Sequence, residues 1–170
     1  REMNRKHTVE EYINIYNNLK KINSLIEFSS DFIISYPGET EADFNDTLDL
    51  VKKIKFINSF SFIFSPRPGT RASDLKMIDK EISKERLIKI QKYLFSHQLD
   101  MNKSFEHKSI EVLVENKLDG QDKFFGRNHY LNSVIFEGEI NKIGKIVNVK
   151  INSSNQNTLF GKIDNKMKAA

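Results

Sequence analysis

Two short stretches of the sequence place polar side chains directly after an apolar run. In the first, Asp31 lies within the apolar run at residues 28–34, and a tight turn containing Ser35, Pro37 and Gly38 follows it. A carboxylate in such a run must be hydrogen-bonded or face a binding site, because burying an unpaired charge is unfavourable. Asp31 is therefore a candidate ligand-binding residue. A structural hydrogen bond to a neighbouring backbone N–H is the alternative.

The second stretch holds one arginine in a stiff loop. Arg67 lies between Pro66 and Pro68, and each proline fixes its own φ angle. A guanidinium held in this way suits an anionic ligand, since its planar fork matches carboxylate and phosphate groups. The alternative is an ordinary surface arginine in a rigid loop.

Two strands and one helix are predicted around these stretches. The first strand covers residues 26–35, and its Phe-Ile-Ile centre should be buried on both faces, as in a parallel sheet. Thr40 and Asp43 form a capping-box pattern, which starts a helix over residues 41–55. A second strand covers residues 60–64, where phenylalanine alternates with other residues.

Parallel strands joined by a right-handed crossover end at one edge of the sheet. Residues 35–40 and 65–70 should therefore line one cleft. Loops at this position carry the chemistry in α/β folds. Two further helices are predicted: one begins at Thr8, with Glu11 completing a capping box, and a long one begins at Ser83. The buried stripe of the long helix is expected to comprise Leu87, Ile90, Leu94, Leu99, Met101 and Phe105.

After Lys108 the apolar period changes from helical to two, which predicts about five short strands. Short strands separated by Asp-Gly, Gly and Ser-Asn turns favour a small antiparallel barrel. Barrels of this size often bind single-stranded nucleic acid through basic and aromatic side chains. A barrel with ordinary polar loops is the alternative. The candidate binding surface comprises Lys123, Phe125, Arg127 and His129.

The composition sets limits on the class of protein. Of the 170 residues, 38% are hydrophobic and 29% are charged, which excludes a disordered chain. No apolar run reaches the length of about 18 residues that a membrane span needs. Cysteine is absent, so the chain has no disulfide and no thiolate metal site. The net charge of +4 allows a nucleic-acid partner without requiring one.

Several segments resemble one enzyme family. Residues 3–8, 30–40 and 62–70 follow one another as in the radical-SAM methylthiotransferases. Gly126 and Arg127, followed by the Asn-Ser-Val-Ile-Phe segment that begins at Asn132, resemble the TRAM domain, the small RNA-binding barrel that those enzymes carry. The resemblance covers nearly the whole chain and rests on several motifs in the right order.

The resemblance implies an α/β fold class in two parts. Residues 1–106 would form the last strands and helices of a partial (β/α) radical-SAM barrel, together with the long linking helix. Residues 107–170 would form the TRAM domain, a small antiparallel, OB-like β-barrel. The family uses S-adenosylmethionine and two iron–sulfur clusters, and a chain without cysteine can hold neither cluster. We therefore expect a C-terminal fragment whose missing N-terminal part binds the clusters.

The resemblance also implies roles for individual residues, none of them catalytic in this fragment. Asp31, Ser35 and Pro37 would contact S-adenosylmethionine. The family usually has glycine at the position of Ser35, and serine lacks the backbone freedom of glycine. Contacts to the substrate are expected from Arg67, Lys123, Arg127 and Asn132.

The implied function is the methylthiolation of an isopentenylated adenosine beside the tRNA anticodon. The expected partner is the tRNA anticodon arm, with no membrane partner, and the complete protein should be a cytoplasmic monomer. One alternative is a standalone RNA-binding TRAM protein. Another is the sister branch that modifies a ribosomal-protein aspartate, although Arg67 and His7 favour a tRNA substrate. A third branch, which acts on threonylcarbamoyladenosine in tRNA, is excluded only weakly.

Overall fold

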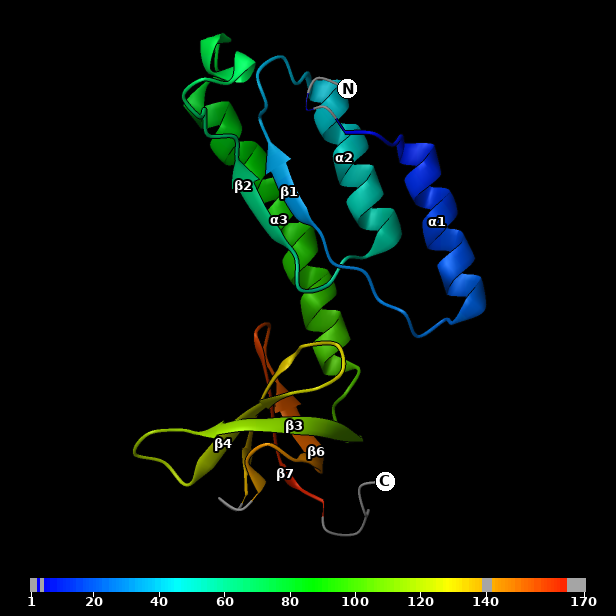
Figure 1. Cartoon of the computed structure of the whole chain (residues 1–170), viewed down its shortest axis with the longest axis vertical. Coiled ribbons are helices and arrows are strands. Elements are labelled where there is room, and N and C mark those ends of the chain that lie inside the picture. Colours follow the sequence, from blue (N-terminus) through cyan, green and yellow to red (C-terminus); the bar gives the residue numbers. More distant parts are fainter. Residues whose placement is uncertain (1–2, 4, 139–141, 165–170) are drawn as a thin grey trace.

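A computed structural model of the chain describes residues 3, 5–138 and 142–164. It consists of an α/β unit and a closed β-barrel joined by one long helix, α3, at Lys80–Lys103 (Figure 1). The predicted fold class, an α/β piece followed by a small OB-like barrel, is confirmed. In the described part of the chain, no helix has the length and apolar character that a membrane crossing requires.

The α/β unit is built on two parallel strands. Strand β1 (Asp31–Ile34) pairs with β2 (Phe60–Ile63), with Asp31 opposite Phe60 and Ile34 opposite Ile63. Helix α2 (Glu41–Ile54) connects them and begins at the predicted capping box of Thr40 and Asp43. Helix α1 (Val9–Ile22) begins at a second predicted capping box, that of Thr8 and Glu11. Both predicted capping boxes are therefore confirmed.

One face of this sheet packs against α2 and α3, and the other is uncovered in the described chain. Phe32 and Ile34 are buried, whereas Ile33 is 41% exposed. On β2, Phe60 and Phe62 are 64% and 52% exposed. The expectation that the first strand is buried on both faces is wrong for this chain, since no described element covers the second face. The strand is also shorter than predicted and begins at Asp31.

Helix α3 begins earlier than predicted, at Lys80, because the Asp79 carboxylate caps it by accepting from the Glu81 and Ile82 backbone N–H groups. Its buried face also differs from the predicted apolar stripe. Two predicted members, Ile90 and Leu94, are buried there, and they share that face with three polar side chains, those of Ser83, Arg86 and Asn102.

Five strands form the closed barrel in the order β3-β4-β5-β7-β6. They are β3 (Ser109–Lys117), β4 (Lys123–Arg127), β5 (Ser133–Glu137), β6 (Ile146–Ser154) and β7 (Thr158–Ile163). The predicted five-stranded barrel is confirmed, with one departure from an antiparallel arrangement. Strand β6 pairs with β3, so β7 fills the place beside β5 and lies parallel to it.

Two glycines let neighbouring barrel strands approach closely. A Cβ added at Gly126 would lie 2.2 Å from the Leu113 carbonyl oxygen, and one at Gly161 would lie 2.3 Å from that of Lys150. Any side chain at either position would therefore force two strands apart. The barrel interior is filled by apolar side chains, including Val112, Val114, Phe124, Val134, Phe136, Val149, Ile151 and Leu159.

Candidate functional site

The loops after β1 and β2, residues 35–40 and 64–72, lie at the same edge of the sheet, and we refer to them together as the strand-end rim. The Tyr36 and Phe64 rings meet edge-on, with centroids 4.9 Å apart. The Phe64 backbone N–H donates to the Ile34 carbonyl oxygen at 2.8 Å, which extends the strand pairing into the rim. The two loops that the sequence predicts to share a cleft are therefore in direct contact.

A cavity of about 720 Å³ opens at this rim. Its wall is partly apolar, from Ile33, Phe62 and Ile63, and partly polar. Arg67 lies in the lining, as the sequence predicts for the two loops, and Arg71 lies there as well. The Thr70 hydroxyl donates to the Arg67 carbonyl oxygen at 2.8 Å, so the loop is held by its own hydrogen bonds.

The three expected cofactor contacts do not line this cavity. Asp31 is exposed on the same strand face as Ile33, but it is the first residue of β1 and so lies at the opposite end of the strand from the rim. Pro37 is buried in the turn. Ser35 is 3% exposed and lines a different cavity, of about 350 Å³, on the side of α3.

Ser35 adopts the left-handed backbone conformation, with φ of 58°. A non-glycine residue in this region is strained by about 1 kcal/mol or more. The Ser35 backbone N–H donates to both carboxylate oxygens of Glu39, each at 3.0 Å. Among the described residues, the buried Ser35 hydroxyl has no hydrogen-bond partner. The carboxylate of Glu39 therefore holds the turn in a conformation that glycine would adopt without strain.

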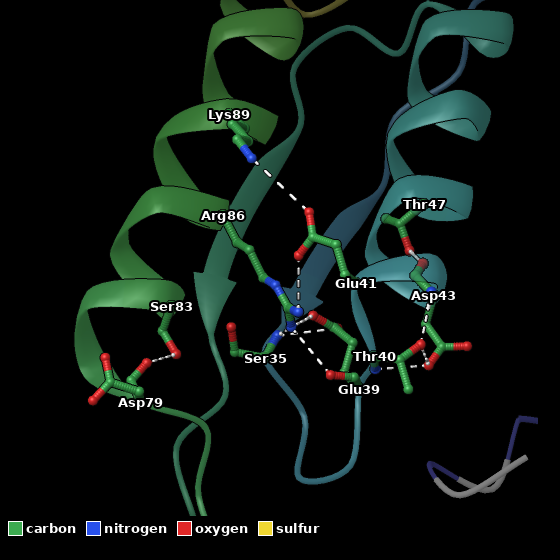
Figure 2. Close-up of polar contacts among 10 residues, drawn as sticks. All are labelled: Ser35, Glu39, Thr40, Glu41, Asp43, Thr47, Asp79, Ser83, Arg86 and Lys89. Carbon is green, nitrogen blue, oxygen red and sulfur yellow. Dashed lines mark hydrogen bonds and ion pairs between the residues drawn. The ribbon is translucent and has the colours of Figure 1, made fainter.

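Arg86 of α3 reaches this turn from the side of the long helix and anchors it (Figure 2). Its guanidinium contacts the Glu39 carboxylate at 2.8 Å and the Glu41 carboxylate at 3.1 Å, and it also donates to the Glu39 carbonyl oxygen at 3.2 Å. The Arg86 side chain is only 7% exposed, and its guanidinium lies over the Phe44 ring at 5.3 Å. The ion pair between Arg86 and Glu39, together with the contact to Glu41, holds the start of α2 and the strand-end rim against α3.

Burial raises the pKa of Glu39 above its ordinary value of 4.5, while the Ser35 N–H and the Arg86 guanidinium oppose that rise. Sequence reasoning missed both members of the pair. A signal was present, because Arg86 is three residues from Ser83 and four from Ile90, which places it on the buried face of α3. A charged residue at core spacing predicts a buried ion pair.

The expected RNA contacts on the barrel lie in two different environments. Lys123 and Arg127 are exposed on the outer face of β4, with the half-buried Phe125 between them. The Arg127 guanidinium contacts the Glu115 carboxylate at 3.1 Å and lies 5.3 Å from the centre of the Phe125 ring. Asn132 is 3% exposed and faces α3, so its side chain is part of the interior and not of the outer surface.

The chemistry of these residues is that of binding. The cavity at the strand-end rim offers an apolar wall beside two guanidinium groups, which suits a ligand with an apolar or planar part and an anionic part. The described residues contain no cluster of three His, Cys, Asp or Glu side chains that could hold a metal ion. With no cysteine in the chain, the thiolates of an iron–sulfur cluster would have to come from elsewhere.

Comparisons with known proteins add two findings. Residues 103–163 match the TRAM domain family. The chain is also similar to proteins named tRNA-2-methylthio-N(6)-dimethylallyladenosine synthase. It is 58% identical over 166 residues to that of Pelagibacter ubique and 44% identical over 162 residues to that of Wolbachia pipientis from Culex pipiens. These alignments cover 98% and 94% of this chain but only 37% of each relative.

Proposed function

This chain is a homologue of part of the tRNA-2-methylthio-N(6)-dimethylallyladenosine synthases and carries a TRAM domain, and we propose that it forms the TRAM-bearing part of such an enzyme. The reaction is the methylthiolation of an isopentenylated adenosine beside the anticodon of tRNA. The observation that carries the proposal is the 58% identity over 98% of the chain, which includes both the rim and the barrel.

The α/β unit would contribute to the cofactor cleft. When bound, S-adenosylmethionine supplies the radical and the methyl group, and the iron–sulfur clusters supply electrons and sulfur. The rim fits part of S-adenosylmethionine, since its cavity combines an apolar wall with the guanidinium of Arg71, and Arg67 in the same lining would contact the substrate. Ser35 and Pro37 are buried, so they would shape the turn and not contact the cofactor through their side chains. Asp31 lies at the end of β1 away from the cleft, so it would contact only a part of the cofactor that extends along the strand.

The uncovered face of the sheet supports the same proposal. Ile33, Phe60 and Phe62 expose apolar surface that soluble proteins normally bury. In a larger α/β barrel this face would pack against the interior, and the exposed edges of the two-stranded sheet would pair with neighbouring strands. The five-stranded C-terminal β-barrel would hold the anticodon arm, with Lys123 and Arg127 of β4 as phosphate contacts.

A chimera tests this function. This chain replaces the corresponding part of the Pelagibacter ubique relative, and the chimera is expressed in bacteria that lack the methylthiolating enzyme. Mass spectrometry of digested tRNA should then detect the methylthiolated, isopentenylated adenosine. A chimera that is folded and cleaves S-adenosylmethionine but leaves tRNA unmodified would contradict the proposal. Methylthiolation of a ribosomal-protein aspartate in the same cells would identify the sister reaction instead.

A further inference from the structure

The cavity that Ser35 lines is distinct from the cavity at the strand-end rim, and we refer to it as the α3 cavity. It has a volume of about 350 Å³ and lies between the turn after β1, the end of β2 and the start of α3. Its walls are largely apolar and include Phe64, Pro66, Met77 and Ile78. Small-molecule sites commonly have volumes of about 300–1,000 Å³. The α3 cavity therefore has room for a small ligand.

Two buried hydroxyl groups line the α3 cavity. Ser35 and Ser83 are each 3% exposed. The Ser83 hydroxyl donates to the Asp79 carbonyl oxygen at 2.9 Å, whereas the Ser35 hydroxyl has no hydrogen-bond partner among the described residues. Figure 2 shows the Ser35 hydroxyl on the side of the turn toward α3, away from the Glu39 carboxylate. Because a buried hydroxyl without a partner is unfavourable, a ligand that hydrogen-bonds to Ser35 would be stabilised there.

Two exposed lysines also line the α3 cavity. Lys80 and Lys84 are four positions apart on α3, so their side chains are neighbours on the helix surface. Lys84 pairs with Glu81 at 2.7 Å, but an exposed pair of this kind contributes little, and Lys80 forms no ion pair within the described residues. Positive charges at the start of a helix oppose its dipole, and like charges at this spacing repel each other. An anionic ligand group would relieve both effects.

We propose that the α3 cavity binds a small carboxylate that has an apolar body and a hydroxyl at the opposite end. The carboxylate would accept hydrogen bonds from the ammonium groups of Lys80 and Lys84. The apolar body would pack between Phe64 and Met77, and the ligand hydroxyl would pair with that of Ser35. Glycine at position 35 would offer no such partner, so the preference for a hydroxyl depends on the serine of this chain. This site is independent of the proposed role in tRNA modification.

The test follows the backbone amide resonances of the full 170-residue chain by two-dimensional NMR while para-hydroxybenzoate is added. This probe carries a carboxylate and a hydroxyl at opposite ends of one ring. The largest shifts should map to residue 35 and to residues 77–84. Two matched probes each lack one polar group: benzoate lacks the hydroxyl, and para-hydroxybenzyl alcohol lacks the carboxylate. Both should bind more weakly than para-hydroxybenzoate.

The role of the lysines is tested with a double variant and a matched control. Lys80→Gln, Lys84→Gln should raise the dissociation constant of para-hydroxybenzoate about tenfold and leave that of the uncharged alcohol unchanged. Lys52→Gln, Lys53→Gln on α2 is the control, because it makes the same change in net charge and also breaks one exposed ion pair, that of Lys52 with Asp49. The control should keep wild-type affinity for both probes.

The role of the hydroxyl is tested with Ser35→Gly, which removes the hydroxyl from the cavity wall. The wild type should bind para-hydroxybenzoate about fivefold more tightly than benzoate, and the glycine variant should bind the two probes alike. Each protein is compared with itself on two probes, so a change in overall stability does not affect the result.

Three results would each overturn the proposal: no binding at about 10 mM probe, equal losses in the two lysine variants, or a preference for the hydroxyl that survives in Ser35→Gly. Ile63 and Phe64 line both cavities, so the probe is located from shifts at residues 80–84 of α3 and 67–72 of the rim. Shifts at residues 67–72 alone would assign the probe to the rim cavity and overturn the proposal as well. The chimera tests the tRNA reaction separately from all of these outcomes.

Discussion

The side-chain amide of Asn132 donates to the side-chain oxygen of Asn102 at 2.7 Å, and both residues are buried where the barrel meets α3. Asn102 in turn donates to the carbonyl oxygens of Asn155 and Gln156, at 2.8 and 3.0 Å. One side chain of α3 therefore connects two loops of the barrel. The orientation of the barrel relative to the rim is set by hydrogen bonds with defined directions and not by apolar packing alone.

A second set of contacts continues this junction. The Asn58 backbone N–H donates to Gln98 at 2.6 Å, and its side chain donates to the Tyr130 carbonyl oxygen at 2.7 Å. The Tyr130 hydroxyl donates to the Leu25 carbonyl oxygen at 2.9 Å. The barrel loop at residues 128–132 is therefore docked against both the loop before β2 and the loop after α1.

Asn102→Ala should lower the free energy of unfolding of the chain by about 2–4 kcal/mol. The change leaves the buried Asn132 amide without its acceptor and removes the donor to the carbonyl oxygens of Asn155 and Gln156. Urea unfolding followed by circular dichroism measures the loss. Asn18→Ala, on the exposed side of α1, is the control and should change stability by less than about 0.5 kcal/mol. Equal stabilities for the two variants would show that the junction contributes little.

Arg86→Met should destabilise the chain by about 3 kcal/mol, because it leaves the carboxylate of Glu39 buried without its cation. The double variant Arg86→Met, Glu39→Gln should recover part of that loss, since the uncompensated charge is gone. Lys89→Met is the control: its ammonium is exposed and 3.9 Å from Glu41, so the change should have little effect. Chemical unfolding of the wild type, the single variant Glu39→Gln and these three variants checks this, and strictly additive effects of the two substitutions would contradict the coupling.

The sequence predicts this fold where the signals are local. Both capping boxes, the turn at Pro37 and Gly38, and the change to period two after Lys108 depend on residues within a few positions of one another, and the structure confirms the helices and the barrel that they predict. Hydrophobic periodicity also identifies much of the core, including Ile90 and Leu94.

The polar contacts that organise the candidate site could not be predicted in the same way. Arg86 and Asn102 have partners far away in the sequence, so their burial depends on which loops fold against α3. Helical spacing places Arg86 on the buried face of α3, but it does not identify the loops that supply its partners. Which side chains of β4, β5 and β7 lie opposite one another depends in turn on strand register, which short strands specify only once they are paired.

Ser35→Gly should stabilise the chain by about 0.5–1 kcal/mol. Glycine relieves the strain of the left-handed conformation at φ of 58°, although it also gains conformational freedom in the unfolded state, which offsets part of the benefit. Ser35→Val should destabilise it by more than that, since a β-branched residue is disfavoured in this region. Thermal unfolding of the three proteins gives the order directly. A glycine variant less stable than the wild type would mean that the serine side chain stabilises the turn.

His97 of α3 should make stability depend on pH. Burial lowers the pKa of His97 below its ordinary value of 6.5, and Lys55 lowers it further while Asp100 raises it. The unfolded chain therefore takes up a proton at this residue at higher pH than the folded chain does. The free energy of unfolding should consequently fall as the pH is lowered through 6.5 and be regained on returning to higher pH.

The comparison of wild type with His97→Gln isolates this effect, because the other titrating groups are shared by the two proteins. Urea unfolding from about pH 7.5 to about pH 5.5 should show a steeper loss of stability in the wild type than in the variant. The buried Nδ1 atom of His97 has no hydrogen-bond partner within the described chain, so no hydrogen bond at that atom stabilises the charged imidazolium. Parallel pH profiles for the two proteins would show that His97 titrates alike in the folded and unfolded states.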